Sequence, residues 1–390
     1  MIDFLGAIVF GAARAARTVV ERVIGRQFQE PSRRGTDPRT ILLVQLDHLG
    51  DAIISTVMLP PLRARYPEAS IEVLAGPWNR EVFEAAPEVD RVHVSRLNRF
   101  ARGRSGFGWV LSALWWGLAL RRRRVDLAID CRGEFPLAVI LWLSGARRRL
   151  GWACGGGRFL LTDSPRFVPD RPEVDSRLAL LAELGIRPRA DEVWRPAFHP
   201  SEQARDRAER LLAELPARSA TGGPLCVAHV GAGMRAKQWS AEHWRALIGR
   251  LVDRLGAQVV LVGSPGDRII ARQIAGRRPR AEVADWTGRL SVAELAAVLQ
   301  RADLALGADS GPAHLAAAVG TPVVVLFSGT NNPGQWRPAG RQVRVCRHPV
   351  DCYPCHRREC PRAEHPCMSG LRPETVAAEV EGLLRQTACR

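Results

Sequence analysis

Short apolar runs with the length of β-strands alternate with helical patterns along most of the chain, and this alternation restricts the fold more than any other feature. In the first half we expect strands over Ile41–Leu46, Ile71–Leu74, Arg91–Val94 and Leu127–Asp130. Helical patterns lie between them, over Ala52–Arg65, Arg80–Ala86 and Val110–Arg122. Apolar strands separated by helices are typical of a parallel sheet that is covered on both faces.

A second series of the same kind follows a connecting region around Arg187–Pro200. Strands are expected over Leu225–Val230, Gln258–Val262, Leu304–Ala308 and Val323–Phe327. Helices are expected over Ala241–Leu255, Asp267–Ala275, Val292–Gln300 and Gly311–Ala318. A chain of 390 residues has room for two domains. We therefore predict an α/β fold with two facing Rossmann-like domains and a ligand site in the cleft between them.

These patterns divide the chain into four parts. We assign residues 1–39 to an amphipathic helix and linker, 40–200 to the first domain, 201–372 to the second domain with a Cys-rich tail, and 373–390 to a C-terminal helix. The first segment lacks the basic start and the small-residue cleavage pattern expected of a signal peptide, and arginines interrupt it, so we expect no membrane span either. Its apolar residues share one helical face, which leaves an interfacial membrane helix and a helix docked on the protein body as alternatives.

The net charge of +16 indicates an anionic partner. A membrane surface and a phosphorylated substrate are candidates, whereas the chain carries no recognised nucleic-acid-binding motif, so we expect no nucleic acid partner. Arginine dominates the excess, which also fits a bias of genome composition. The segment Trp109–Arg124 places Trp115 and Trp116 beside four arginines. It suits the headgroup layer of an anionic membrane, and equally a helix packed on the core with a basic C-terminus.

The first segment with chemical potential is Gln45-Leu46-Asp47-His48-Leu49-Gly50-Asp51, where the first strand ends and a helix begins. Gly50 permits the close approach of a backbone or a substrate. Asp51 would stand in the first helical turn, where its carboxylate can accept a proton from a hydroxyl group. An acidic residue is also an ordinary feature of a helix start, and the helix dipole would lower its pKa and weaken it as a base.

Two further segments lie where strands of the second series end. Gly231-Ala232-Gly233-Met234-Arg235-Ala236-Lys237 combines small residues with a lysine, which suits a diphosphate, although the glycines could also form a simple tight turn. Gly307-Ala308-Asp309-Ser310-Gly311-Pro312-Ala313-His314 offers a hydroxyl group and backbone amides at a helix start. Asp309 could instead cap that helix, and His314 could be an ordinary helix residue.

Together these segments resemble glycosyltransferase family 9, the heptosyltransferase family. The similar stretches are Leu42–Pro67, His229–Leu247 and Asp285–Phe327, and with their order and spacing they cover about Ile41–Arg337. The resemblance implies a GT-B fold, a first domain that holds the acceptor, and a second domain that holds an ADP-activated heptose. It also implies inversion at the anomeric carbon without a required cofactor or catalytic metal.

The resemblance also assigns roles by motif. Asp51 would be the general base, and Lys237 would contact the diphosphate. The implied donor-binding residues are Gly231, Ala232, Gly233, Lys237, Asp309, Ser310, Gly311 and His314. Gly263, Ser264 and Asp267 match the family segment near the nucleoside. Gly50, Arg80 and Arg132 are candidates for the acceptor, although each arginine also fits an ordinary surface position.

The function implied is the transfer of a heptose to a lipopolysaccharide-core-like or other saccharide acceptor by a single displacement. Another nucleotide sugar, or an inactive nucleotide-binding scaffold, remains an alternative because a few polar contacts decide specificity. Cysteines scattered through a long chain suit a reducing compartment. We expect a cytoplasmic protein, with peripheral contact at the inner face of the cytoplasmic membrane as a further expectation.

Five cysteines cluster late in the chain, at Cys346, Cys352, Cys355, Cys360 and Cys367. They suffice for a structural zinc site, but the paired spacing of zinc knuckles is missing, so zinc, a disulfide and free thiols all remain open. The final helix, Pro373–Leu384, is expected to return to the first domain, as in the family's fold.

Overall fold

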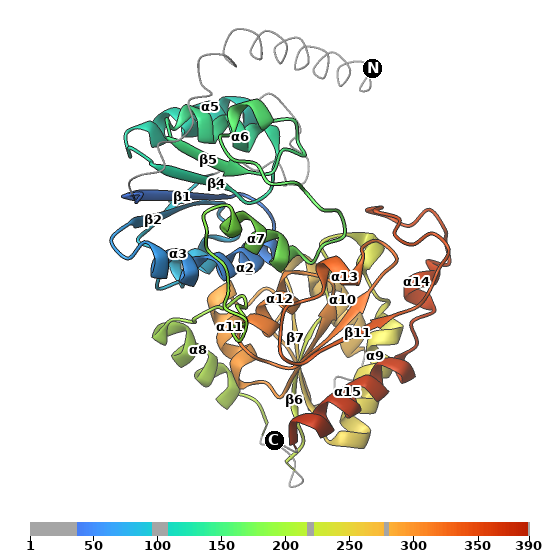
Figure 1. The fold of residues 1–390 in the computed structure, drawn as a ribbon. Coiled ribbons are helices and arrows are strands. Elements are labelled where there is room, and N and C mark those ends of the chain that lie inside the picture. Colours follow the sequence, from blue (N-terminus) through green and yellow to red (C-terminus); the bar gives the residue numbers. More distant parts are fainter. Residues whose placement is uncertain (1–36, 96–107, 217–221, 277–280, 389–390) are drawn as a thin grey trace.

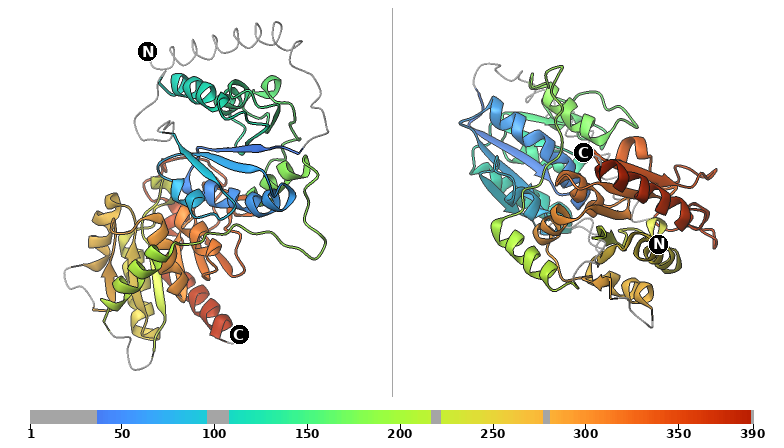
Figure 2. Two further views of the ribbon diagram at one scale, coloured as in Figure 1. Left: turned by 90° about the vertical axis from the view of Figure 1, so that its left-hand side faces the viewer. Right: turned by 90° about the horizontal axis from the view of Figure 1, so that it is seen from below.

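The computed structural model describes residues 37–95, 108–216, 222–276 and 281–388. The expected N-terminal amphipathic helix and most of its linker lie outside these residues. The described chain forms two parallel sheets, each with helices on both faces (Figures 1 and 2), which confirms the predicted two-domain α/β fold. None of the helices in the described ranges combines the length and the apolar character needed to cross a membrane.

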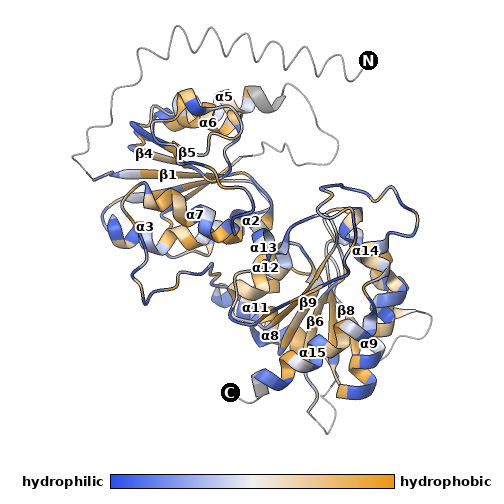
Figure 3. Cartoon of the chain, turned by 45° about the vertical axis from the view of Figure 1, so that its right-hand side comes forward, coloured by the Kyte–Doolittle hydropathy of each residue, from blue (hydrophilic) through white to orange (hydrophobic). Residues whose placement is uncertain are grey.

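The first sheet has the strand order β3-β2-β1-β4-β5, with β1 at its centre. Its strands are β1 (Thr40–Gln45), β2 (Ser70–Ala75), β3 (Arg91–Val94), β4 (Leu127–Asp130) and β5 (Arg148–Gly151). Ile41 of β1 is in register with Ile71 of β2 and Leu127 of β4. The sheet is apolar on both faces because helices cover both of them (Figure 3).

Each face of the first sheet carries its own group of helices (Figure 1). One face packs against α2 (Leu49–Ser55), α3 (Leu59–Arg65), α4 (Arg80–Glu84) and α7 (Glu173–Ala182). The other face packs against α5 (Gly108–Arg121) and α6 (Phe135–Leu143). Since α2 follows β1 directly, its first turn lies at the carboxyl edge of the sheet.

The second sheet has the strand order β11-β10-β9-β6-β7-β8. Its strands are β6 (Leu225–His229), β7 (Gln258–Val262), β8 (Val283–Asp285), β9 (Leu304–Ala308), β10 (Val323–Phe327) and β11 (Val343–Arg347). The helices of this half are α8 (Glu202–Ala213), α9 (Ala241–Leu255), α10 (Arg268–Ala275), α11 (Val292–Arg301), α12 (Gly311–Ala318), α13 (Pro333–Trp336), α14 (Pro366–Ser369) and α15 (Pro373–Ala388).

Local sequence signals set the ends of the longer helices. The Ser240 hydroxyl group accepts a hydrogen bond from the backbone N–H of His243 at 3.2 Å and caps the start of α9. Gly256 ends that helix with a φ of 60°, a conformation that glycine adopts without strain. Ser291 and Glu294 form a capping box at the start of α11. These signals mark where α9 begins and ends and where α11 begins.

The structure corrects the prediction for the final helix. α15 does not return to the first domain but packs against α9, β10 and β11 of the second. Val376, Val380 and Leu383 carry this contact, because they are buried in the same apolar cluster as α9. The domain borders at 200/201 and 372/373 stay predictions, although the two sheets fall on either side of the first of them.

Candidate functional site

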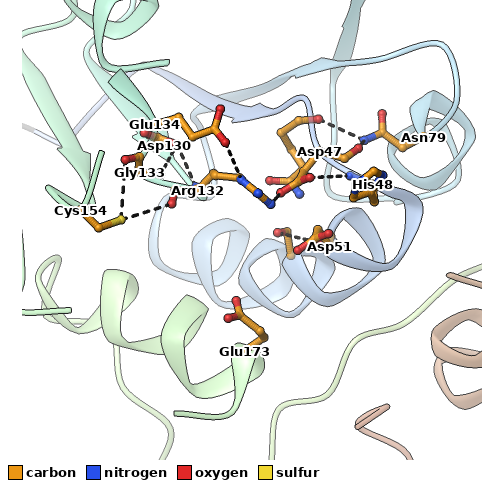
Figure 4. Close-up of polar contacts among 12 residues, drawn as sticks. Asp47, His48, Asp51, Asn79, Asp130, Arg132, Gly133, Glu134, Cys154 and Glu173 are labelled. Carbon is orange, nitrogen blue, oxygen red and sulfur yellow. Dashed lines mark hydrogen bonds and ion pairs between the residues drawn. The ribbon is translucent and has the colours of Figure 1, made fainter. Parts of the chain in front are cut away.

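Asp51 lies in the first turn of α2, where the sequence predicted it. Its side chain is buried, and its Oδ1 has no hydrogen-bond partner among the described residues. The guanidinium group of Arg177 in α7 lies 3.8 Å from Oδ1. One oxygen of this buried carboxylate is therefore without a hydrogen-bond partner among the described residues, and a buried arginine lies beside it. Figure 4 shows Asp51 between Arg132 and Glu173.

Burial decides the protonation of Asp51. It raises the pKa of Asp51 to about 7, and the nearby Asp47 acts in the same direction, while Arg177 and Arg132 act against it. The pKa of Asp51 is therefore raised, in contrast to the lowering that a helix start alone would produce. A carboxylate with a pKa near neutrality is well suited to take up a proton as a general base.

Arg177 is held by its own buried contacts. Its Nε donates to the Ser55 hydroxyl group at 3.1 Å, and its Nη1 donates to Glu173 at 2.9 Å. The second oxygen of Glu173 accepts a hydrogen bond from Gln335 of α13 at 2.8 Å. A chain of contacts thus runs from the second domain through Glu173 and Arg177 to Asp51.

Arg132 lies on the side of Asp51 away from Glu173 (Figure 4). It forms an ion pair with Asp47, and its Nε donates to Glu134 at 3.1 Å. The Asp47 backbone carbonyl in turn accepts hydrogen bonds from Trp78 at 2.6 Å and Asn79 at 2.9 Å. Arg132, a predicted acceptor residue, is therefore part of the site and fixed in place.

Asp130, at the end of β4, is a second buried carboxylate near Arg132. Its Oδ1 accepts the backbone N–H groups of Arg132 at 2.8 Å and Gly133 at 3.0 Å. Its Oδ2 has no hydrogen-bond partner among the described residues. Burial raises the pKa of Asp130 to about 7, although the two backbone N–H groups lower it.

On the second domain, Lys237 and Asp309 form a buried ion pair. Lys237 Nζ donates to Asp309 Oδ2 at 2.6 Å and to the Asp309 carbonyl at 3.1 Å. Asn331 Nδ2 also donates to Oδ2, at 2.8 Å. Asp309 thus holds a lysine and an amide together at the carboxyl edge of the second sheet, and the role of Lys237 toward a diphosphate stays a prediction.

Two histidines beside this pair are neutral at physiological pH. Burial lowers the pKa of both His229 and His314 to about 4. His229 Nδ1 lies 3.3 Å from the Ser310 hydroxyl group, which also donates to the Ala308 carbonyl at 3.0 Å. His314 can therefore serve a ligand as a hydrogen-bonding group, whereas the positive charge comes from Lys237.

The starts of α2 and α12 meet across the two domains, and glycines make this approach possible. A Cβ atom on Gly50 would lie 3.1 Å from the His314 ring. A Cβ atom on Gly311 would lie 2.9 Å from Leu49 Cβ, closer than real contacts allow. The segment of the expected base and the segment of the expected diphosphate site are thus in direct contact.

The remaining predicted residues lie at different places. Asp267 accepts hydrogen bonds from the Ser264 backbone and hydroxyl group, both at 2.7 Å, and packs against Gly231 and Gly263, so its visible role is to shape that loop. Ala232 and Gly233 are partly or fully exposed in the same loop region. Arg80 is exposed and pairs with Glu84 on its own helix at 3.7 Å, so the structure does not bring it to the site.

The late cysteines do not converge. Cys346 and Cys367 are buried and Cys352 is exposed, and the described cysteines are free thiols. Within the described ranges, no group of His, Cys, Asp or Glu is arranged to hold a metal ion, so the geometry gives the zinc alternative no support. A groove of about 900 Å³ lies beside this tail, between α9, α10 and residues 359–369, and no predicted site residue lines it.

Sequence reasoning missed several residues of the site. Arg177, Glu173, Asn331 and Gln335 were not predicted, and Asp130 was recognised only as the end of a strand. Arg177 and Glu173 stand four residues apart with opposite charges, a spacing typical of paired residues on one helix face. That signal could have indicated a pair, but not that the pair is buried against Asp51.

Known proteins with similar sequences belong to one family of glycosyltransferases. A model of glycosyltransferase family 9 (heptosyltransferase) matches residues 115–365. Lipopolysaccharide heptosyltransferase 2 of Escherichia coli K12 is 26% identical over 353 residues, which cover 89% of this chain and 99% of the relative. Lipopolysaccharide heptosyltransferase 1 of Pseudomonas aeruginosa PAO1 is 31% identical over 380 residues, which cover 88% of this chain and 98% of the relative.

Solved structures have the same architecture. The E. coli ADP-heptose lipopolysaccharide heptosyltransferase II has a TM-score of 0.72 at 24% identity, with 90% of this chain and 99% of that chain covered. A family 9 glycosyltransferase from Veillonella parvula has a TM-score of 0.76 at 22% identity, with 89% and 98% covered. These likenesses concern the fold.

Proposed function

The chain belongs to glycosyltransferase family 9 and is a glycosyltransferase with the GT-B fold, and from this premise we propose that it transfers a heptose from an ADP-activated donor. The acceptor is a saccharide of the lipopolysaccharide-core type. Relatives that align over nearly their whole length are named lipopolysaccharide heptosyltransferases, which supports both the sugar and the acceptor class. The ADP moiety rests on the resemblance of the motifs to the family.

One observation carries the proposal. The first turn of α2, with the buried carboxylate Asp51, lies directly against the start of α12, beside the Lys237–Asp309 pair. A base for the acceptor and a cationic group for the diphosphate are the two functions that a single displacement requires. The two helix starts come from different domains and are in contact, which supports this assignment.

The proposed reaction is an inverting displacement. Asp51 takes the proton from an acceptor hydroxyl group while that oxygen forms a bond to the anomeric carbon of the donor. The bond between the anomeric carbon and the diphosphate oxygen breaks, and ADP leaves with the electron pair. Lys237 and the backbone N–H groups at the start of α12 stabilise the negative charge that develops on ADP.

The location is part of the proposal. An acceptor of the lipopolysaccharide-core type is carried on a lipid, so we propose that the enzyme works in the cytoplasm at the inner face of the cytoplasmic membrane.

A nucleotide panel tests the donor class. ADP, ADP-heptose, UDP, GDP and CMP are added at equal concentration, and the melting temperature of the full chain is recorded. We expect ADP and ADP-heptose to raise it most, and the Lys237→Met variant to lose much of that rise. A preference for UDP or GDP would contradict the proposed donor but leave the glycosyltransferase fold unaffected, whereas no response to any nucleotide would contradict nucleotide-sugar binding altogether.

A further inference from the structure

Helix α5 exposes a continuous apolar stripe. Leu111, Leu114, Trp115 and Leu118 are 53%, 38%, 61% and 55% exposed, and their spacing places them on one face of the helix. The opposite face packs on α6, where Ala113 and Leu120 are buried. Helix α5 lies on the side of the first domain away from the second domain (Figures 1 and 2). We call these four residues the α5 stripe.

The stripe differs from the other exposed apolar residues. Val193 and Ile269 are 66% and 71% exposed, but they stand in distant segments. Single exposed apolar side chains are common on soluble proteins, whereas a group on one face indicates a partner surface. The question is therefore which partner covers the stripe.

The end of the helix carries positive charge. Arg121, Arg122, Arg123 and Arg124 follow the stripe, and all four are exposed. Arg123 reaches back to the buried Glu72 of β2, which also contacts His93 at 2.6 Å. This anchor fixes the end of α5 on the sheet, so the other three arginines extend from a rigid base. Their charge favours an anionic partner over a neutral one.

Contact with Trp116 holds the exposed side chain of Trp115 in place. Trp116 faces inward toward His93, with 6.3 Å between the ring centroids, and it supports Trp115 edge-on at 4.8 Å. Trp115 is thereby held in an exposed position. Indole rings prefer the boundary between the apolar and polar layers of a membrane, and arginines prefer the headgroups. Leucines beside them supply the apolar area that enters the acyl boundary.

We propose that the α5 stripe inserts into the interfacial layer of an anionic lipid bilayer, with Arg121, Arg122 and Arg124 on the headgroups. The helix has 14 residues and is too short to span a bilayer, which needs about 20. It therefore lies on the surface. α2 packs on the opposite face of the sheet, so this contact leaves Asp51 and the second domain away from the lipid. The inference extends the proposed function by naming its membrane surface.

Vesicle sedimentation tests the inference with the full chain and without sugar transfer. Vesicles of phosphatidylcholine alone are compared with vesicles that also contain phosphatidylglycerol. The variant Leu111→Ser/Trp115→Ser/Leu118→Ser should bind the anionic vesicles about tenfold more weakly or worse, since it loses the apolar part of the contact. The control Val193→Ser/Ile269→Ser removes exposed apolar side chains elsewhere and should bind like the parent.

Charge is tested separately. Arg121→Gln/Arg122→Gln/Arg124→Gln should weaken binding and reduce its dependence on salt, while Arg147→Gln/Arg187→Gln/Arg385→Gln, with the same change in net charge, should have a smaller effect. The melting temperature and its rise with ADP show that each variant is folded, and they report on the proposed function independently.

Three results would overturn the inference. The parent could bind neither kind of vesicle. The apolar variant could bind as tightly as the parent, which would assign the contact to another segment such as residues 1–36. The parent could be a dimer that the apolar variant splits into monomers, which would make a second copy of the chain the occupant of the stripe.

Discussion

At the scale of single residues, the protonation of Asp51 controls the proposed reaction. The base acts only when it is deprotonated, and burial raises its pKa to about 7. We therefore expect kcat/KM to rise with pH between about pH 5 and pH 8, with a midpoint near 7.

Asp51→Asn should lower kcat about 10²- to 10⁴-fold while ADP still raises the melting temperature. Turnover at the parental rate in this variant would remove Asp51 from the role of base.

Arg177 should set the position of that pH profile. Its charge lowers the pKa of Asp51, so Arg177→Met should move the midpoint of the kcat/KM profile to higher pH, and Arg177→Lys should restore most of it. Removing one partner of a buried ion pair lowers the free energy of unfolding by about 3–5 kcal/mol. The double variant Glu173→Gln/Arg177→Met avoids this cost, because it leaves no unpaired glutamate. Arg187→Met, at an exposed site, is the control. A midpoint that stays in place would assign Arg177 a structural role alone.

Asp130 should affect stability rather than the rate profile. Burial raises the pKa of Asp130 from its ordinary value of 3.8 to about 7 in the folded state, so the folded state binds the proton more tightly than the unfolded chain does. The contribution of protonated Asp130 to the free energy of unfolding is complete below about pH 4 and is lost as the pH rises through about 7. Asp130→Asn should remove this fall in the free energy of unfolding with rising pH, which amounts to about 4 kcal/mol at most. Urea unfolding at a series of pH values measures it, and parallel curves for parent and variant would contradict the assignment.

At the scale of elements, the contact between α2 and α12 depends on glycine. Gly311→Ala would place a Cβ atom 2.9 Å from Leu49 Cβ, so the two helices must separate. We expect a fall in kcat of at least about tenfold and a destabilisation of about 1–3 kcal/mol, measured by steady-state kinetics and by urea unfolding.

Gly382→Ala is the matched control, because it lies in α15 with open space around it. This variant should gain up to about 1 kcal/mol from helix propensity and keep its activity. Equal activity of Gly311→Ala and Gly382→Ala would mean that the close approach of α2 and α12 is not needed for transfer.

The sequence predicted the inner strands and the edge strand β3, but not the edge strands β5, β8 and β11. β4, β7, β9 and β10 have the predicted bounds, because strands that are buried on both faces are continuous apolar runs. β5 carries two arginines and does not follow that pattern. Arg149 is nevertheless accommodated, since it donates to the carbonyls of Leu160 at 2.6 Å and Ala146 at 2.7 Å. These contacts are tertiary and leave no local signal.

The sequence predicted where α15 forms, but not which part of the protein it packs against. α15 was expected from its sequence, but nothing in that sequence states which domain its apolar face covers. Its burial against α9 is a property of the folded chain. α6, an apolar run of nine residues, has no polar face that marks it as a helix, because it is buried between α5 and the sheet.

At the scale of the whole molecule, the site exists only where the two domains meet. One buried apolar cluster extends over both halves. Polar contacts join them as well: Glu173 with Gln335 at 2.8 Å, Asp170 with Asn332 at 3.3 Å, and Glu81 with the backbone N–H of Ala293 at 2.8 Å. The motifs of Asp51 and Lys237 could be predicted because they are local. The contacts that link the domains through Arg177 and Glu173 could not be predicted, since they depend on the placement of α7 between the domains.

The most direct test is sugar transfer itself. The purified chain is incubated with ADP-heptose and a panel of truncated lipopolysaccharide cores. The products are measured by mass spectrometry together with the ADP released, and NMR gives the anomeric configuration of the new linkage. We predict that an acceptor gains the mass of one heptose for each ADP released, with the anomeric configuration inverted, and that Asp51→Asn forms almost no product. Transfer from a UDP- or GDP-linked sugar in the same assay, with ADP-heptose left unchanged, would contradict the account.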